Sequence, residues 1–282
     1  MEKLRFLRSR LPYVLKHGLV RGITLGHCPI CERRTVFFKE GAWLRDQFKC
    51  IRCFSIPRWR AIVVVLEKFF PKWRELTIHE SSPGGAASDK LAKECKNCVQ
   101  THWFQDIPLG QKHAGYRCED LERQTFSDAE FDLVVTQDVF EHVLDPAKGF
   151  AEIARTLKPG GAHVFTIPWY YWKPTLVRAS RNESGRLRHH VKPDYHDNPI
   201  DPKGSLVVTE WGADFCELVF RVSGLTTTVV HIHDSKQGIE ADFIEVFISR
   251  KAAADSPNQV LQPIGQSVPV CGVILPASRP GS

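Results

Sequence analysis

The chain has 282 residues, of which 43% are hydrophobic and 25% charged, and it carries a formal net charge of +6. This composition is ordinary for a globular protein and excludes a wholly disordered chain, while the length suits one large domain plus a small one. The longest apolar run near the N-terminus, 61–66, is far shorter than the ~18 residues that predict a membrane span. Residues 1–22 show no secretory signal, and nine cysteines do not suit a disulfide framework. We therefore expect a protein of the reducing cytoplasm.

The first part of the chain is strongly basic. Residues 1–34 contain eight lysines and arginines but only two acidic residues, Glu2 and Glu32. Apolar residues recur near helical spacing in 1–24, although Pro12 interrupts the pattern. Such a segment could contact nucleic acid, an anionic lipid surface or a phosphorylated substrate, or it could be a solvated basic face.

Four cysteines in residues 25–60 form two Cys-x-x-Cys pairs that are separated by eighteen residues: Cys28, Cys31, Cys50 and Cys53. This spacing is typical of a zinc ribbon, in which two tight turns aim four thiolates at one ion. A closed four-thiolate site has no open position, so we expect a structural zinc. A rubredoxin-type iron site and four unligated thiols are the alternatives. Segments 35–38 and 43–48 are expected to form a hairpin between the two pairs.

After the ribbon, residues 57–72 read as a linker helix, because apolar residues mark one helical face and Pro71 ends the pattern. Strands are then expected at 76–80 and 99–104, with a helix at 86–95 between them. A further short β-branched run, 131–135, is followed by helical spacing through Leu157 and by a second apolar run, 162–167. This is a β-α-β unit, and its crossover is expected to be right-handed.

The same residues carry a resemblance to a known family. FDLVVTQDVFEHV, followed by EIARTLKPGGAHVFTIP, resembles the fourth strand, following helix and fifth strand of class I S-adenosylmethionine-dependent methyltransferases, of the type 11-like group. The resemblance covers roughly 76–251. It implies a doubly wound, seven-stranded, mostly parallel sheet, which is a Rossmann-like methyltransferase fold. We therefore divide the chain into a basic lead-in and zinc ribbon (1–60), a methyltransferase domain (61–251) and a disordered tail (252–282).

The resemblance also implies S-adenosylmethionine as cofactor and suggests which residues hold it. The family's loop after the first strand has an acid followed by Gly-x-Gly-x-Gly; here the loop reads ESSPGG and keeps only the last two glycines. A carboxylate before the fourth strand is expected to accept from the adenine amino group, with a backbone amide beside it. Two residues at the carboxyl end of that strand face the amino-acid portion of the cofactor. The expected cofactor residues are Glu80, Ser81, Gly84, Gly85, Asp120, Leu121, Gln137 and Asp138.

Two features of the binding region stay open at this stage. The second strand lacks the usual ribose-binding acid, so either Asp106 replaces it or an aromatic residue of 102–104 stacks on the adenosine. As plain residues, ESSPGG is also an ordinary turn, and Asp120 is also an ordinary exposed acid. Glu141 and His142 are expected on the helix after the fourth strand, with His142 as a packing residue.

A long polar and aromatic insertion, 169–204, follows the fifth strand and is expected to cover a substrate pocket. Within it, His196 is the candidate general base, because a neutral imidazole titrates near working pH. The alternative is that it only structures the loop.

The expected function is methyl transfer from S-adenosylmethionine to a small-molecule, sugar or lipid-linked acceptor. One alternative is an RNA methyltransferase that uses the basic N-terminus together with the zinc ribbon. The other is a non-catalytic binding module on a degenerate methyltransferase fold, because the glycine loop is altered.

Overall fold

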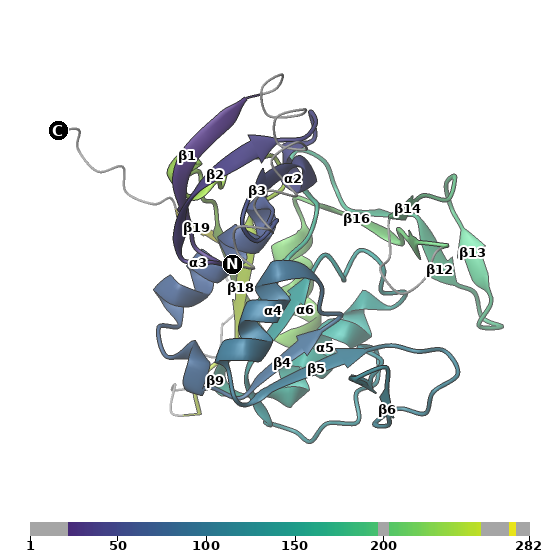
Figure 1. The fold of residues 1–282 in the computed structure, drawn as a ribbon. Coiled ribbons are helices and arrows are strands. Elements are labelled where there is room, and N and C mark those ends of the chain that lie inside the picture. The colour runs from purple at the N-terminus through teal and green to yellow at the C-terminus, as the bar shows by residue number, and fades with distance from the viewer. Residues whose placement is uncertain (1–21, 197–202, 255–270, 275–282) are drawn as a thin grey trace.

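The computed structural model describes residues 22–196, 203–254 and 271–274 (Figure 1). Its centre is a sheet in the order β19-β17-β18-β9-β8-β4-β5-β7-β6. The bounds of these strands are β4 Ile78–Ser81, β5 Cys98–His102, β6 Lys112–His113, β7 Tyr116–Cys118, β8 Phe131–Gln137, β9 Leu157–Thr166, β17 Thr226–Val230, β18 Val246–Arg250 and β19 Cys271–Ile274. None of the described helices combines the length and apolarity that a bilayer crossing needs.

The predicted doubly wound sheet is confirmed. Seven strands, β7-β5-β4-β8-β9-β18-β17, pair in parallel except β18, which runs antiparallel to both of its neighbours. The remaining two strands, β6 and β19, are short additions at the edges of this Rossmann-like sheet. Because β19 pairs with β17, part of the segment expected to be disordered forms a strand, and the rest of 255–282 lies outside the described residues.

Four helices cover the two faces of the sheet, and their bounds are α3 Pro57–Phe69, α4 Gly85–Glu94, α5 Pro146–Thr156 and α6 Phe215–Ser223. Successive side chains along a strand point to opposite faces of the sheet. Leu133 and Val135 of β8 pack with α3 and α4, whereas Val134 packs with α5 and α6. This two-faced burial explains the continuous apolar run in β8. The linker helix α3 therefore belongs to the sheet as much as to the ribbon.

The cysteine-rich segment is a three-stranded antiparallel sheet with strands β1 Ile23–Cys28, β2 Arg33–Lys39 and β3 Phe48–Cys50. The expected second hairpin strand at 43–48 is wrong, because most of it forms the short helix α2 Leu44–Gln47. Ribbon residues Phe37 and Phe48 share one hydrophobic core with α3 and the central sheet. Buried Arg60 of α3 strengthens this junction by donating to the carbonyl groups of Phe48 and Gly238 at 2.7 Å each.

The turn between β8 and α5 differs from the sequence prediction. Glu141 and His142 lie in this turn and not on a helix. Helix α5 starts only at Pro146, because Asp145 caps it by accepting from the amide of Lys148 at 3.1 Å, and proline favours the first helical position. The two side chains therefore stand at the carboxyl edge of the sheet.

The insertion after β9 forms short strands that project to one side of the sheet (Figure 1). Their bounds are β10 Trp169–Tyr170, β11 Leu176–Val177, β12 Ala179–Arg181, β13 Leu187–His189, β14 Tyr195–His196, β15 Ser205–Leu206 and β16 Thr209–Gly212. Strand β16 joins the base of the insertion, because it pairs with both β10 and β11. The separate hairpin pairs β12–β13 and β14–β15 lie between β11 and β16 in the chain.

Candidate functional site

At the carboxyl edge of the sheet, a buried carboxylate connects three elements. Glu80 of β4 is 1% exposed and accepts hydrogen bonds from Ser88 Oγ at 2.6 Å, Gln100 Nε2 at 2.8 Å and Gln137 Nε2 at 3.1 Å. Burial raises the pKa of Glu80, and the three hydrogen bonds oppose that rise. The structure thus brings the predicted residues Glu80 and Gln137 together, with their side chains engaged in fixing the loop and helix α4.

The loop that follows β4 approaches its neighbours closely on one side and is open on the other. Gly85 has φ +76°, and a Cβ there would lie 2.1 Å from the ring of Trp59, so only glycine fits. The space over Gly84 is open, because no heavy atom of the described residues lies within 4 Å of the position a Cβ would take. Its amide donates to Ser88 Oγ at 2.9 Å. The backbone at Gly84 is therefore exposed, while Ser81 is buried in β4.

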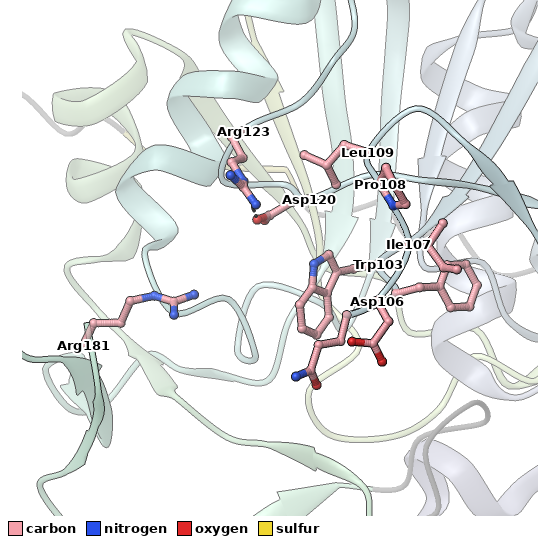
Figure 2. Close-up of a pocket in the computed structure, with 10 residues that line it drawn as sticks. Trp103, Asp106, Ile107, Pro108, Leu109, Asp120, Arg123 and Arg181 are labelled. Carbon is pink, nitrogen blue, oxygen red and sulfur yellow. Dashed lines mark ion pairs between the residues drawn. The ribbon is translucent and has the colours of Figure 1, made fainter. Parts of the chain in front are cut away.

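A cavity of ≈ 500 Å³ lies beside this edge (Figure 2). It is bounded by segment 103–109 after β5, by Asp120 and Arg123 after β7, and by Arg181 from the insertion. Figure 2 shows Asp120 paired with Arg123 and Arg181 reaching toward the cavity from the opposite side. Its size falls in the range of small-molecule sites. Two residues that the sequence left as alternatives, Trp103 and Asp106, both line it.

Asp120 lines this cavity with a restrained carboxylate. Its Oδ1 accepts from the amide of Glu122 at 2.9 Å, and its Oδ2 lies 3.5 Å from Nε of Arg123. Leu121 buries its side chain in the core below α5 and is 8% exposed. The two predicted residues therefore differ in their placement: the Asp120 carboxylate borders the cavity, whereas the Leu121 side chain anchors the loop in the core.

Asp138 has another environment than the sequence suggested. Its carboxylate accepts two hydrogen bonds from Arg45 of α2, at 2.6 and 2.7 Å, and one from Thr166 Oγ1 at 2.8 Å. Arg58 of α3 lies 3.1 Å away. Burial pushes the pKa of Asp138 up, but the charges of Arg45 and Arg58 outweigh it and hold the pKa below its usual range. The carboxylate thus ties the ribbon and α3 to the sheet, and it is not free to contact a cofactor.

His196 lies beside the turn that follows β8. Its ring and that of His142 meet edge to face, with centroids 5.2 Å apart. Donor atoms of Glu141, His142 and His196 all lie within 4.8 Å of one another. Burial raises the pKa of Glu141 to about 8, and the charge of Asp138 adds to the rise. The predicted base therefore has an acidic and an imidazole neighbour that the sequence did not reveal.

The four ribbon cysteines converge. Their sulfur atoms lie within 4.8 Å of one another, and Sγ of Cys28 is 3.7 Å from Sγ of Cys53. Ser55 Oγ lies 3.4 Å from Cys28 and 3.2 Å from Cys53. Hydrogen bonding within the cluster, first from Cys31, lowers the pKa of Cys28. Four thiolates at two tight turns are a donor set that suits zinc.

Sequence reasoning missed several residues that build this region. Ser88 and Gln100 hold Glu80, and Arg181 borders the cavity from the insertion. Ser88 could have been found, because it is a polar residue in the first crossover helix facing a buried acid. Arg181 carried no local signal, since its position depends on how the insertion folds back.

Comparison with known proteins points to one kind of domain. Residues 83–165 match a family model described as a methyltransferase domain. A dimethylglycine N-methyltransferase of Parasynechococcus marenigrum (strain WH8102) is 51% identical over 48 residues, which are 17% of this chain and 17% of that protein. A ubiquinone biosynthesis O-methyltransferase of Coxiella burnetii is 30% identical over 91 residues, which are 29% of this chain and 39% of that protein. The chain thus spans well under half the length of these curated relatives.

Two solved structures with similar folds are methyltransferases by name. An S-adenosylmethionine-dependent methyltransferase from Mesorhizobium loti is 16% identical, with a TM-score of 0.45 over 68% of this chain and 98% of that one. The 1,6-didemethyltoxoflavin-N1-methyltransferase of Burkholderia thailandensis is 16% identical, with a TM-score of 0.43 over 69% and 78% of the two chains. The fold described above rests on the strand order itself.

Proposed function

We propose that this protein transfers a methyl group from S-adenosylmethionine to a small-molecule acceptor. The observation that carries the proposal is the methyltransferase-domain match over 83–165. That segment begins in the loop after β4 and ends in β9, so it contains Gly84 and Gly85 of the loop, the carboxyl ends of β5 and β8, and the residues that line the cavity other than Arg181. In open α/β sheets, ligands bind at this edge.

The adenosine part of the donor fits the cavity between Trp103 and Asp120. The Asp120 carboxylate would accept from the adenine amino group, and the amide of Leu121 would donate beside it. Trp103 offers a face for stacking, and Asp106 offers a carboxylate for the ribose hydroxyls. In this arrangement both candidates for replacing the missing acid of the second strand, Asp106 and the aromatic Trp103, would contact the adenosine.

The amino-acid part of the donor would lie over the open backbone of Gly84. Ser81, Gly84 and Gly85 shape that loop, and Glu80 and Gln137 hold it in place through their hydrogen bond. Asp138 would act indirectly, because its carboxylate is bound to Arg45. The cofactor's sulfonium supplies an activated methyl group, so the chain's main task is to align donor and acceptor.

The acceptor side is formed by the insertion. It presents exposed aromatic rings, among them Tyr171 and Trp172, together with Arg181 at the cavity. The curated relatives named above methylate dimethylglycine or act in ubiquinone biosynthesis, by their names, which supports a small-molecule acceptor with a nucleophilic nitrogen or oxygen. The basic lead-in that motivated an RNA substrate lies mostly in 1–21, outside the described residues.

The ribbon cysteines would hold a structural zinc ion. The support is the convergence of four sulfur atoms, from Cys28, Cys31, Cys50 and Cys53, in a small sheet whose core continues into the main domain. Zinc at this place would fix the ribbon, and with it Arg45, against the carboxyl edge of the sheet.

Calorimetric titration of the full chain with S-adenosylhomocysteine tests the proposal. We expect saturable binding of one molecule per chain, weakened about 5- to 150-fold in Asp120→Ala. Asp128→Ala is the matched control, because it removes an acid that pairs with Arg155 away from the cavity. Absence of saturable binding in the wild-type chain would exclude a methyl donor site. Methyl-labelled S-adenosylmethionine with metabolite pools, followed by mass spectrometry, would then identify the acceptor.

A further inference from the structure

Three potential ligands meet where the turn after β8 reaches the β14–β15 hairpin. Glu141 and His142 come from the turn, and His196 comes from β14, more than fifty residues later in the chain. One donor atom from each lies within 4.8 Å of the other two. This cluster belongs to neither the cavity of Figure 2 nor the cysteine site.

Glu141 is the unusual member. Glu141 is only 1% exposed. Within the described part of the chain, neither of its carboxylate oxygens accepts a hydrogen bond from another residue. Buried carboxylates are normally paired, hydrogen-bonded or bound to a metal, because an uncompensated one is costly. The backbone of Glu141 is meanwhile firmly held, since its carbonyl accepts from the amides of Val208 at 2.7 Å and Thr209 at 3.1 Å. A well-fixed residue therefore carries an unsatisfied acidic group.

His142 has the orientation of a metal ligand. Its Nδ1 lies 2.8 Å from the carbonyl oxygen of Leu206, which can only accept, so Nδ1 carries the proton. The lone pair is then on Nε2, which lies 3.9 Å from Oε1 of Glu141. A backbone carbonyl that fixes the tautomer in this way is typical of metal-binding histidines.

His196 completes the cluster from an exposed hairpin. Gly204, next to β15, has φ +80° and approaches so closely that a Cβ would lie 2.6 Å from the carbonyl oxygen of His196. The hairpin therefore depends on glycine to hold His196 at this distance from the turn. Because the His196 side chain is exposed, the cluster is open to solvent on that side.

Neighbouring charges leave the carboxylate of Glu141 uncompensated. Arg45 lies near, but its Nη atoms bind Asp138 and its Nε donates to the carbonyl of Phe243 at 2.7 Å. Arg58 pairs with Asp138 and with Asp46. The positive charges of the two arginines are thus matched by the negative charges of Asp138 and Asp46. A cation beside Glu141 would neutralise its carboxylate.

We propose that Glu141, His142 and His196 bind a divalent transition-metal cation. Two imidazoles and one carboxylate form a ligand set that suits Mn²⁺, Fe²⁺, Co²⁺ or Zn²⁺ and leaves positions open. Ligands about 2.1 Å from an ion lie roughly 3.0–3.4 Å apart. Binding would therefore draw Nε2 of His142 and Oε1 of Glu141, now 3.9 Å apart, slightly together and would move the exposed His196 toward them. A ligand could reach such a cation from the side of the exposed His196.

The role of this cation rests on the proposed methyl transfer; its binding does not. An acceptor hydroxyl bound to the cation would lose its proton to water more readily. Its oxygen would then form the bond to the methyl carbon while the carbon–sulfur bond breaks, and the sulfur keeps the electron pair. In this arrangement His196 acts as a metal ligand and not as the general base that the sequence suggested. The cation promotes loss of the proton, and water accepts it.

Mn²⁺ titration followed by electron paramagnetic resonance tests the site, because manganese prefers carboxylate and imidazole to the thiolates of the ribbon. We expect one saturable Mn²⁺ per full-length chain. Glu141→Gln and His196→Ala should each weaken it at least tenfold. Glu245→Gln and His190→Ala are the matched controls, since they remove a buried carboxylate paired with His231 and an insertion imidazole bonded to Ser180. Both should bind Mn²⁺ as the wild type does.

Two results would overturn the proposal: no saturable Mn²⁺ binding in the wild-type chain, or unchanged binding in both Glu141→Gln and His196→Ala. His196 is exposed, so its variant should fold even if the change at the buried Glu141 perturbs the turn. Binding of S-adenosylhomocysteine, measured on the same samples, separates this question from the proposed function, because a chain can pass either test and fail the other.

Discussion

The ion pair between Asp138 and Arg45 should contribute strongly to the stability of the whole chain. Asp138→Asn keeps the shape and tolerates the positive φ of +53° at this position, but it removes the negative charge. Arg45, which is 5% exposed, would then be buried without its charged partner, and Arg58 would keep only Asp46. Breaking one side of a buried pair in this way costs about 3–5 kcal/mol.

The complementary change is less severe. Arg45→Met leaves Asp138 with Arg58 at 3.1 Å and Thr166 at 2.8 Å, so its charge stays partly compensated. We expect a loss of about 2–3 kcal/mol, which is the range for one hydrogen bond to a charged group. The double variant should be less destabilised than the sum of the two single variants by about 2 kcal/mol. The reason is that removal of both Asp138 and Arg45 leaves neither of them as an unpaired buried charge.

Urea unfolding of the full chain at pH 7, followed by tryptophan fluorescence, measures these free energies. The Asp138 pKa is lowered in the fold, so its contribution is fully present above the unfolded value of 3.8 and is lost as pH falls below it. Asp128→Asn is the control, because it breaks an exposed pair with Arg155 and should cost at most about 1 kcal/mol. A loss below about 1 kcal/mol for Asp138→Asn, or strict additivity in the double variant, would refute the reasoning.

Three further predictions concern the metal, the donor and the core. Purified protein should contain one zinc per chain, and Cys50→Ser should release it and weaken the ribbon, which elemental analysis and thermal unfolding would detect; absence of stoichiometric metal in chelator-free protein contradicts this. Asp120→Ala should weaken S-adenosylhomocysteine binding by about 1–3 kcal/mol in calorimetry, because an adenine donor loses its partner; an unchanged affinity places the adenine elsewhere. His79 is fully buried between Phe126 and Phe131, and burial lowers its pKa to about 3 from 6.5. Because the unfolded chain then binds the extra proton, His79 should contribute a fall in stability of about 1.4 kcal/mol per pH unit between pH 6.5 and 3, and His79→Leu should reduce the slope by that amount. An equally steep curve for His79→Leu assigns the acid sensitivity to other groups.

Local patterns in the sequence were sufficient for the central β-α-β unit, whereas the full seven-stranded sheet was implied by the family resemblance. The buried run 131–135, the turn residues Pro159 to Gly161 and the apolar run 162–167 predict two adjacent parallel strands, because burial on both faces requires continuous apolar residues. The spacing of the cysteine pairs likewise predicts convergence, since two short turns limit where four sulfur atoms can go. These features depend on residues close together in the sequence, or on the general rule that a strand–helix–strand segment places its two strands in parallel.

What the tertiary structure decided is which distant side chains share a site. Arg45 and Asp138 are 93 residues apart, yet they form the pair that joins ribbon and sheet. The sequence analysis predicts a helix at Glu141, but the cap at Asp145 sets the helix start beyond it, and the Glu141 carboxylate meets His196. No local rule contains these contacts, because they follow from how the insertion and the ribbon fold back onto one edge of the sheet. The sequence by itself therefore determined the central β-α-β unit and the convergence of the four cysteines, whereas the charge balance of the functional edge exists only once the chain has folded.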